Sequence, residues 1–213
     1  MTMAATKRTP IKREPIPAKA AWRNFAVLFT LMIAGGSFMY WFGAYKTYHF
    51  VEVQPAVLYR TGNQGLREFS TAVRRSESKT IVSLVDDQEQ ADATKPQFSQ
   101  EAEMAAKQNI KFVRVPVKLG GWPTSADVQA FLAAATDAKN QPVIVHCAQG
   151  VRRTGMMVAA YQMSVLNYDK AKAVAAIESF GHSDRTIADI KKFIEIYDPA
   201  TRSVTQTMQQ SDE

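Results

Sequence analysis

An uncharged apolar stretch near the N-terminus limits how this chain can fold. Residues Phe25–Tyr45 read FAVLFTLMIAGGSFMYWFGAY, 21 residues without a charge, and a helix of that length matches the roughly 30 Å hydrocarbon core of a membrane. Aromatic residues gather at its ends, as in the interfacial belts of spanning helices. We therefore expect one transmembrane helix at 25–45, after a basic leader at 1–24. A cleaved signal peptide is the alternative, disfavoured by the length of the run and its bulky aromatic end.

The positive charge of the chain lies in this leader region. The 213 residues carry 26 Lys and Arg and 20 Asp and Glu, a net charge of +6. Seven of the bases and one acid lie within residues 1–50, so residues 51–213 are electrically balanced. A nucleic-acid partner is not expected, because the folded part has no excess of basic residues. Six bases precede the apolar run, so the positive-inside rule places the N-terminus in the cytoplasm and the folded part on the non-cytoplasmic side.

Beyond the apolar run, short segments rich in Val and Ile alternate with helical patterns. Strands are predicted at 57–60, 80–85, 111–117 and 142–147, and helices at 64–75, 98–108, 125–139, 153–166, 169–180 and 184–197. This alternation predicts an α/β fold with a mainly parallel sheet flanked by helices. We expect the domain to cover residues 51–198 and the polar residues 199–213 to form a tail.

Cys147 is the only cysteine of the chain, and it ends an apolar strand, VIVHC, that a loop, AQGVR, joins directly to a helix. A single cysteine excludes an intramolecular disulfide and a cysteine-cluster metal site. Backbone N–H groups of such a loop, with the helix N-terminus, can hold a phosphate-sized anion, and Gly150 permits the tight turn. The same donors favour a nucleophilic thiolate at Cys147. Arg153 offers a planar fork for two phosphoryl oxygens.

The segment His146–Gly155, HCAQGVRRTG, resembles the H-C-x5-R-[S/T]-G signature of cysteine-dependent protein tyrosine and dual-specificity phosphatases. A looser likeness over 51–198, carried by VLYRTG and by the SLVDD and VPV strand ends, is similar to the small atypical dual-specificity branch. The resemblance implies a dual-specificity phosphatase-like fold and a phosphocysteine intermediate, with no metal or cofactor.

The resemblance also implies a role for each residue of the signature. Cys147 would form the intermediate, Arg153 would bind the phosphoryl group, and Thr154 would assist release of the thiolate. His146 would order the loop by hydrogen bonding and would not act as a base. The phosphate-binding residues would be Ala148, Gln149, Gly150, Val151, Arg152 and Arg153.

The sequence departs from the family at the general acid. Members usually carry an aspartate on the loop after the strand that corresponds to VPV, and Lys118 stands at that place here. The Trp122–Thr124 tripeptide, WPT, has threonine where larger tyrosine phosphatases have the acid, and its spacing is too short. Asp86, Asp87 and Asp184 are candidates for a relocated acid, judged by their positions in loops. Without an acid, good leaving groups should react fastest, because they need less protonation.

Two functions are compatible with these residues. The first is a single-pass, membrane-anchored phosphatase that acts on a phosphorylated protein of the phosphotyrosine type or on a polyanionic small molecule of the inositol phosphate type. The second is a catalytically weak phosphate-binding module that only holds a phosphorylated partner. The first is favoured because a pure binder has no chemical need for the Cys, Arg and Thr trio. A rhodanese-like sulfur transferase is disfavoured, since it typically has a shorter return to arginine and no following Thr-Gly.

Overall fold

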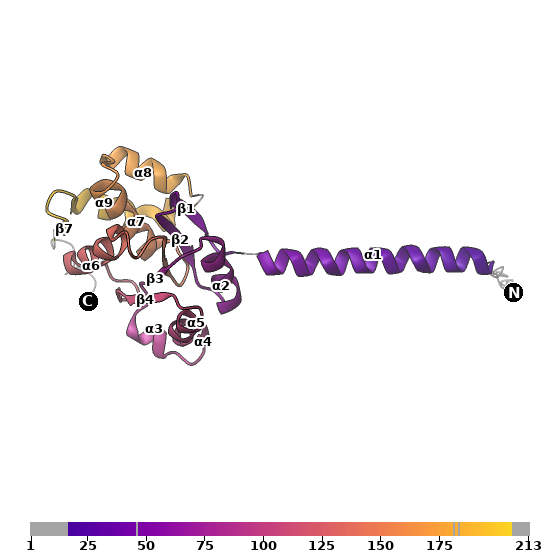
Figure 1. Cartoon of the computed structure of the whole chain (residues 1–213). Helices are drawn as coiled ribbons and strands as arrows, with labels where there is room; N and C mark the ends of the chain where they lie inside the picture. Colours follow the sequence, from indigo (N-terminus) through magenta and orange to yellow (C-terminus); the bar gives the residue numbers. More distant parts are fainter. Residues whose placement is uncertain (1–16, 46, 181, 183, 206–213) are drawn as a thin grey trace, which may run out of the picture. The chain divides into compact units, whose positions relative to one another are not determined.

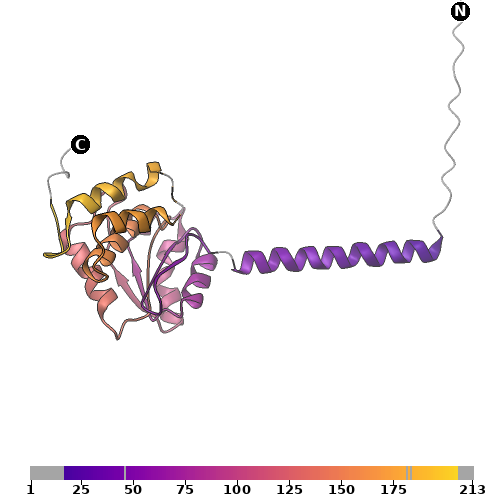
Figure 2. The ribbon, with the colours of Figure 1, turned by 90° about the horizontal axis from the view of Figure 1, so that it is seen from above.

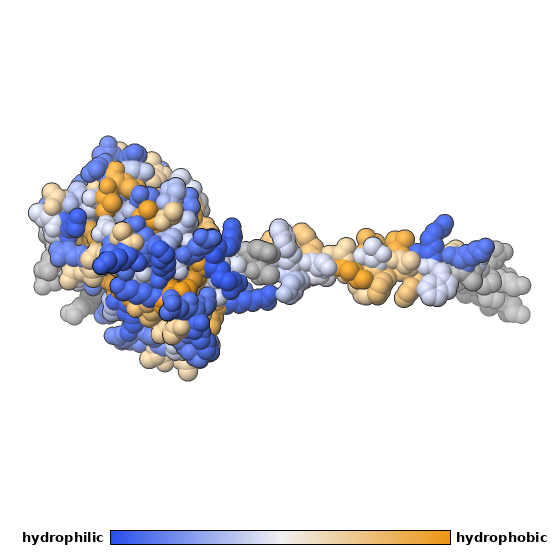
Figure 3. Space-filling model, viewed as in Figure 1, coloured by the Kyte–Doolittle hydropathy of each residue, from blue (hydrophilic) through white to orange (hydrophobic). Residues whose placement is uncertain are grey.

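The computed structural model describes residues 17–45, 47–180, 182 and 184–205, and the chain divides near residue 43 into two compact units. The first unit is built on helix α1 (Ala18–Tyr45) (Figure 1). The segment Trp22–Phe42 is apolar and long enough to cross a membrane, and none of it is buried within the structure. Its surface is largely apolar, with hydrophilic side chains gathered near the N-terminal end (Figure 3). The expected N-terminal apolar helix is thereby confirmed, although it begins at Ala18 and not at Phe25.

The second unit is an α/β domain around a five-stranded sheet. Its strands are β1 (Val51–Gln54), β2 (Leu58–Gly62), β3 (Thr80–Ser83), β4 (Lys111–Arg114) and β5 (Val143–Cys147). They lie side by side in the order β1-β2-β5-β3-β4, with β1 antiparallel to β2 and the other pairs parallel. The predicted mainly parallel sheet is confirmed. All five residues of β5 are buried, as the apolar sequence of this central strand indicates.

Helices cover both faces of this sheet (Figure 2). They are α2 (Leu66–Arg75), α3 (Asp87–Ala91), α4 (Pro96–Ser99), α5 (Glu101–Lys107), α6 (Ser125–Thr136), α7 (Arg152–Ser164), α8 (Lys170–Glu178) and α9 (Asp184–Ile196). On one face Val143 and Val145 pack with side chains of α6 to α9, forming the larger core. On the other face Ile81 and Ile144 pack with side chains of α2 and α5. Neighbouring strand residues thus enter opposite cores, and each buried aliphatic side chain contributes about 1.5–3 kcal/mol.

Several elements differ from the sequence-based expectation. The edge strand β1 was not predicted, because it is only four residues long and Pro55 follows it directly. The strand expected at 111–117 ends at Arg114, although the N–H groups of Val115 and Val117 still donate to the carbonyls of Ser83 and Leu84 at 2.9 and 3.3 Å. The single helix expected at 98–108 is divided into α4 and α5, and α3 precedes them.

The C-terminal boundary of the domain also lies further along the chain than expected. Strand β7 (Ser203–Val204) pairs with β6 (Tyr197–Asp198), and the N–H of Val204 donates to the hydroxyl of Ser125 at 2.9 Å. These residues therefore belong to the domain and not to the polar tail expected from residue 199. Residues 206–213 of that tail and residues 1–16 of the leader lie outside the described residues.

Candidate active site

The segment between β5 and α7 forms a tight loop, residues 148–151, which we call the cysteine loop. Cys147 ends β5, and its sulfur accepts a hydrogen bond from the N–H of Gly150 at 3.2 Å. Gly150 has φ +70°, a left-handed conformation that suits glycine, and a Cβ there would lie 2.4 Å from the carbonyl oxygen of Thr61. The loop therefore lies directly against the end of β2, and one of its N–H groups turns toward the thiol as predicted.

A cavity of about 480 Å³ lies at this end of the sheet. It is lined by Gln64, Glu89, Lys95, Gln97, Phe98, Leu119, Gly120, Cys147, Ala148, Gln149, Arg152 and Arg153. Five of the residues predicted for the site thus share its wall, and His146, Gly150, Val151 and Thr154 are buried close by in the chain. The Thr154 hydroxyl is buried without a hydrogen-bond partner among the described residues.

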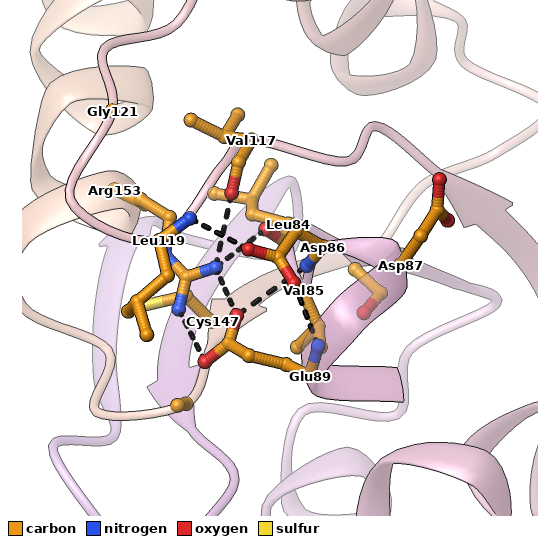
Figure 4. A network of polar contacts seen from close by, with 12 residues as sticks. Leu84, Val85, Asp86, Asp87, Glu89, Val117, Leu119, Gly121, Cys147 and Arg153 are labelled. Carbon is orange, nitrogen blue, oxygen red and sulfur yellow. Dashed lines mark hydrogen bonds and ion pairs between the residues drawn. The ribbon is translucent and has the colours of Figure 1, made fainter. Parts of the chain in front are cut away.

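Arg153 is held by a carboxylate that the sequence analysis missed, Glu89 (Figure 4). Its Nη1 and Nη2 donate to Glu89 Oε2 and Oε1 at 2.5 and 3.0 Å, and Nη1 also donates to the carbonyls of Leu84 and Val117, both at 3.1 Å. Burial acts to lower the pKa of Arg153, but the hydrogen bonds to Glu89 and the charge of Cys147 outweigh it and raise the pKa. Within the described part of the chain, Nε–H and the second Nη2–H have no protein partner, so two donors remain for an anion.

A local signal for Glu89 does exist in the sequence. Asp86 caps α3 and accepts from the N–H of Glu89, whose side chain turns back to the N–H of Asp86. This reciprocal pair is a capping box, recognisable from an acidic or hydroxyl residue followed three positions later by Glu. The pattern locates a helix start, but it does not show that the same glutamate reaches Arg153.

The three candidate acids lie in different surroundings. Asp86 is buried beside Arg153 (Figure 4), and its two oxygens accept the N–H groups of Glu89 and Leu119 at 2.7 and 2.6 Å. Burial acts to raise the pKa of Asp86, but these backbone hydrogen bonds outweigh it and lower the pKa. Asp87 is exposed and pairs with Arg114 at 2.8 Å, and Asp184 is exposed at the start of α9. None of the three lines the cavity.

The loop after β4 carries no acid in place of Lys118. Lys118 is exposed, and its neighbour Leu119 contributes an exposed apolar side chain to the cavity wall. The Trp122–Thr124 tripeptide leads into α6, where the Thr124 hydroxyl caps the helix in a box with Asp127. The threonine of that tripeptide is therefore a helix cap.

Arg152 connects the loop after β4 to helix α9 by hydrogen bonds. Its Nε donates to Asp189 Oδ2 at 2.6 Å and its Nη1 donates to the Gly121 carbonyl at 2.6 Å. The guanidinium also lies over the ring of Trp122, 5.9 Å from its centre. Arg152 lines the cavity as expected for a phosphate-binding residue, but its guanidinium is engaged with the protein.

His146 is fully buried behind Cys147 and faces a second buried group, Glu101. Its Nδ1 lies 3.4 Å from the Cys147 carbonyl, which only accepts, so Nδ1 carries the proton and Nε2 faces Glu101 Oε2 at 3.5 Å. Asn63 and Ser83 donate to the same carboxyl group at 2.6 and 2.9 Å. Burial lowers the pKa of His146 to about 3 and raises that of Glu101 to about 7. Burial thus favours a neutral pair over an ion pair.

Comparison with known proteins agrees with this geometry. A family model described as "DSP-PTPase phosphatase fused to NAD+ Kinase" matches residues 47–195, which include the whole sheet, the cysteine loop and Arg153. The chain belongs to this DSP-PTPase family. The DSP-PTPase match begins at residue 47, four residues before the start of β1 and ahead of the boundary expected at residue 51.

Curated relatives match the DSP-PTPase domain over short segments. The vaccinia virus (strain Western Reserve) protein "Dual specificity protein phosphatase OPG106" is 58% identical over 38 residues, which are 18% of this chain and 22% of the viral protein. "Probable NAD kinase 2, chloroplastic" of Oryza sativa subsp. japonica is 30% identical over 61 residues, 29% of this chain and 6% of that protein. The matches therefore span less than a quarter of either relative.

Solved structures share the DSP-PTPase fold over most of the domain. The core catalytic domain of the PP-IP phosphatase SIW14 from S. cerevisiae, in complex with citrate, has a TM-score of 0.58 at 22% identity and covers 70% of this chain and 85% of that chain. P. aeruginosa TpbA has a TM-score of 0.54 at 22% identity, covering 73% of this chain and 88% of that chain. These likenesses show the fold.

Proposed function

We propose that this chain is a cysteine-dependent phosphatase that hydrolyses phosphomonoesters through a phosphocysteine intermediate. The observation that carries this proposal is the shared wall of one cavity, where Cys147 and Arg153 lie together. The sulfur of Cys147 accepts a hydrogen bond from the N–H of Gly150. Glu89 orients Arg153, which keeps two N–H donors for an anion. A nucleophile and a rigid anion-binding fork on one wall are what phosphoryl transfer to sulfur requires.

In the first proposed step the Cys147 thiolate attacks phosphorus, so that a P–S bond forms and the ester P–O bond breaks. The N–H groups of the cysteine loop and the fork of Arg153 bind the non-bridging oxygens, where charge is greatest in the transition state. In the second step water attacks phosphorus, the P–S bond breaks and phosphate leaves. The buried hydroxyl of Thr154 is the proposed donor to the departing thiolate.

The proposed substrates are of the phosphotyrosine or the inositol phosphate type. SIW14 is described as a PP-IP phosphatase, and a cysteine-to-serine variant of TpbA was solved in complex with pTyr. Those activities and ligands belong to the neighbours. In this chain the cavity wall combines the bases Lys95 and Arg152 with the apolar side chains of Phe98 and Leu119, which suits a phosphate on an aromatic ring or on a highly charged scaffold.

We further infer that α1 anchors the domain to a membrane. The segment Trp22–Phe42 has the length and composition for one span, and six bases precede the apolar run. The positive-inside rule then assigns the N-terminus to the cytoplasm and the catalytic domain to the non-cytoplasmic side. Protease added to sealed cells with a permeable outer layer should digest the domain, whereas protection until lysis would contradict this orientation.

Turnover by the full chain in detergent tests the proposed activity. Wild type should release phosphate from an aryl phosphate, and Cys147→Ser should lose turnover while it still binds inorganic phosphate, because the hydroxyl is a poor nucleophile in an intact loop. Glu103→Gln is the matched control, since it changes only an exposed carboxylate that pairs with Lys107. Phosphate binding by wild type without turnover would support the binding module instead.

A further inference from the structure

Four consecutive carbonyl oxygens, from Cys147 to Gly150, accept hydrogen bonds from residues 49–64. The pairs are Asn63 N–H to Cys147 O at 3.1 Å, Gln64 Nε2 to Ala148 O at 2.8 Å, His49 Nδ1 to Gln149 O at 2.7 Å, and Arg60 Nη2 to Gly150 O. Three of these donors lie on β2 or directly after it, where the sheet itself holds them. His49 is the exception, because it precedes β1 and follows α1 by only a few residues.

His49 holds one particular peptide group of the cysteine loop. The carbonyl of Gln149 and the N–H of Gly150 belong to the same planar unit and point in opposite directions. The carbonyl accepts from His49 at 2.7 Å, and the N–H donates to the sulfur of Cys147 at 3.2 Å. A hydrogen bond at one end of a peptide group fixes and polarises the other end. His49 is therefore linked to the sulfur of Cys147 through one peptide group, that between Gln149 and Gly150.

The backbone around His49 is arranged to hold its ring in this place. The carbonyl of Tyr48 accepts the N–H of Gly62 at 2.8 Å and the hydroxyl of Thr61 at 2.9 Å, which fastens the segment to β2. His49 itself has φ 51°, a left-handed conformation that is uncommon outside glycine. Its ring packs against those of Tyr48 and His182, with centres 4.1 and 4.9 Å away. A residue keeps such an uncommon backbone conformation only where the contacts around it hold it there.

We propose that His49 is a positioning residue of the active site, and that the catalytic unit includes residues 47–50, which precede β1. The proposal rests on the proposed phosphatase activity. Because the Gln149 carbonyl only accepts, His49 Nδ1 is the donor in this hydrogen bond. The orienting effect on the Gly150 N–H therefore requires a donor at the position of His49 Nδ1.

Variants of His49 in the full chain, kept in detergent, test this assignment. His49→Ala and His49→Phe remove the donor, and kcat/KM for an aryl phosphate should fall about tenfold, the upper range for loss of one hydrogen bond to a neutral carbonyl. His49→Asn should remain within about threefold of wild type, since its amide can donate from the same position and asparagine accepts a left-handed backbone. Equal activity of the three variants and wild type would overturn the proposal.

A second readout does not depend on turnover. The alkylation rate of Cys147 by iodoacetamide at neutral pH should fall about tenfold or more in the Ala and Phe variants and return in the Asn variant, because the Gly150 N–H supports the thiolate. If His49→Ala fails to fold, the Phe and Asn variants decide the outcome. Alkylation rates that are the same in all folded variants would contradict the proposal.

Arg75→Ala is the matched control. Arg75 donates to the Thr47 hydroxyl at 3.4 Å and lies over the Phe50 ring, so it supports the same segment without bonding to the cysteine loop. Its activity and alkylation rate should stay within about threefold of wild type. A loss in Arg75→Ala as large as in His49→Ala would show that the segment acts only through general stability. An inactive wild type whose alkylation still depends on His49 would refute the proposed function and not this inference.

Discussion

The carboxylate of Glu89 accepts hydrogen bonds from both terminal nitrogens of the Arg153 guanidinium, with Nη1 to Oε2 at 2.5 Å and Nη2 to Oε1 at 3.0 Å. Both side chains are only 5% exposed, so the pair is screened little by solvent. A planar group fixed along one edge presents its remaining donors in a single direction. The orientation of the anion-binding fork therefore exists before any substrate arrives, which reduces the entropy cost of binding.

Glu89→Ala should impair both catalysis and stability. It leaves the buried charge of Arg153 without its partner, so we expect the free energy of unfolding to fall by about 3–5 kcal/mol and kcat/KM to fall by roughly 10- to 100-fold. Steady-state kinetics and denaturant unfolding measure the two effects. Glu103→Ala is the control, because Glu103 makes only an exposed pair with Lys107. Unchanged kinetics in a folded Glu89→Ala protein would show that Arg153 needs no such support.

Asp86 should prove structural and not the proton donor. Its two oxygens already accept two backbone N–H groups, and its pKa is lowered, so it is ionised at neutral pH. Asp86→Asn should reduce the free energy of unfolding by about 1–2 kcal/mol and leave the shape of the pH–rate profile unchanged.

Asp87→Asn and Asp184→Asn complete that comparison, because both side chains are exposed and should tolerate the change. A fall of about 10²- to 10⁴-fold together with loss of the alkaline limb, in any one of the three variants, would identify that residue as the general acid.

The leaving group should control the rate strongly. Among the described residues that line the cavity the acidic side chain is Glu89, and both of its oxygens are engaged by Arg153. Phenolic and anhydride phosphates should therefore be hydrolysed much faster than phosphoserine or simple alkyl phosphates, by about 10²-fold or more, the usual contribution of an acid. Rates across a series of substituted aryl phosphates measure this dependence. Equal rates on phosphotyrosine and phosphoserine would mean that a proton donor has been overlooked.

Glu101 should make stability depend on pH. Burial raises its pKa to about 7 from an ordinary value of 4.5, so the folded protein binds the proton more tightly than the unfolded chain does. This contribution is fully present below pH 4.5 and is lost as the pH rises through about 7. His146 acts in the opposite sense, because its pKa falls to about 3 and stability rises with pH between about 3 and 6.5.

The comparison of wild type with Glu101→Gln isolates the glutamate. The amide cannot ionise, so the variant should gain stability relative to wild type between pH 5 and 8, by of order 1–3 kcal/mol. Denaturant unfolding at several pH values measures the difference. A constant difference across that range would show that Glu101 ionises in the folded protein as it does in the unfolded chain.

Site residues could be predicted from the sequence where they lie close together along the chain. The apolar strand before Cys147, the glycine at the turn and the return to Arg153 lie within one strand, loop and helix, and the structure places Cys147 and Arg153 on one cavity wall. The parallel sheet likewise followed from alternating apolar runs.

The residues that orient this segment could not be predicted in the same way. Glu89 lies 64 positions from Arg153, and His49 lies 100 positions from Gln149. Each of these two pairs forms only after segments that are distant in the sequence have come together in the fold. Neither Glu89 nor His49 belongs to a periodic apolar pattern that the sequence would reveal. The capping box locates Glu89 on a helix without revealing its partner, and a histidine between an apolar helix and an edge strand carries no signal of its own.

The most direct test of the account is to trap the covalent intermediate. The full chain in detergent would be mixed with an aryl phosphate, quenched rapidly in denaturant and digested, and the phosphoryl group located by mass spectrometry. We expect it on the peptide that contains Cys147 in wild type and nowhere in Cys147→Ser, which should still bind phosphate. A Cys147→Ser protein that hydrolyses the substrate at the wild-type rate, or a phosphoryl group found on another residue, would contradict the central claim.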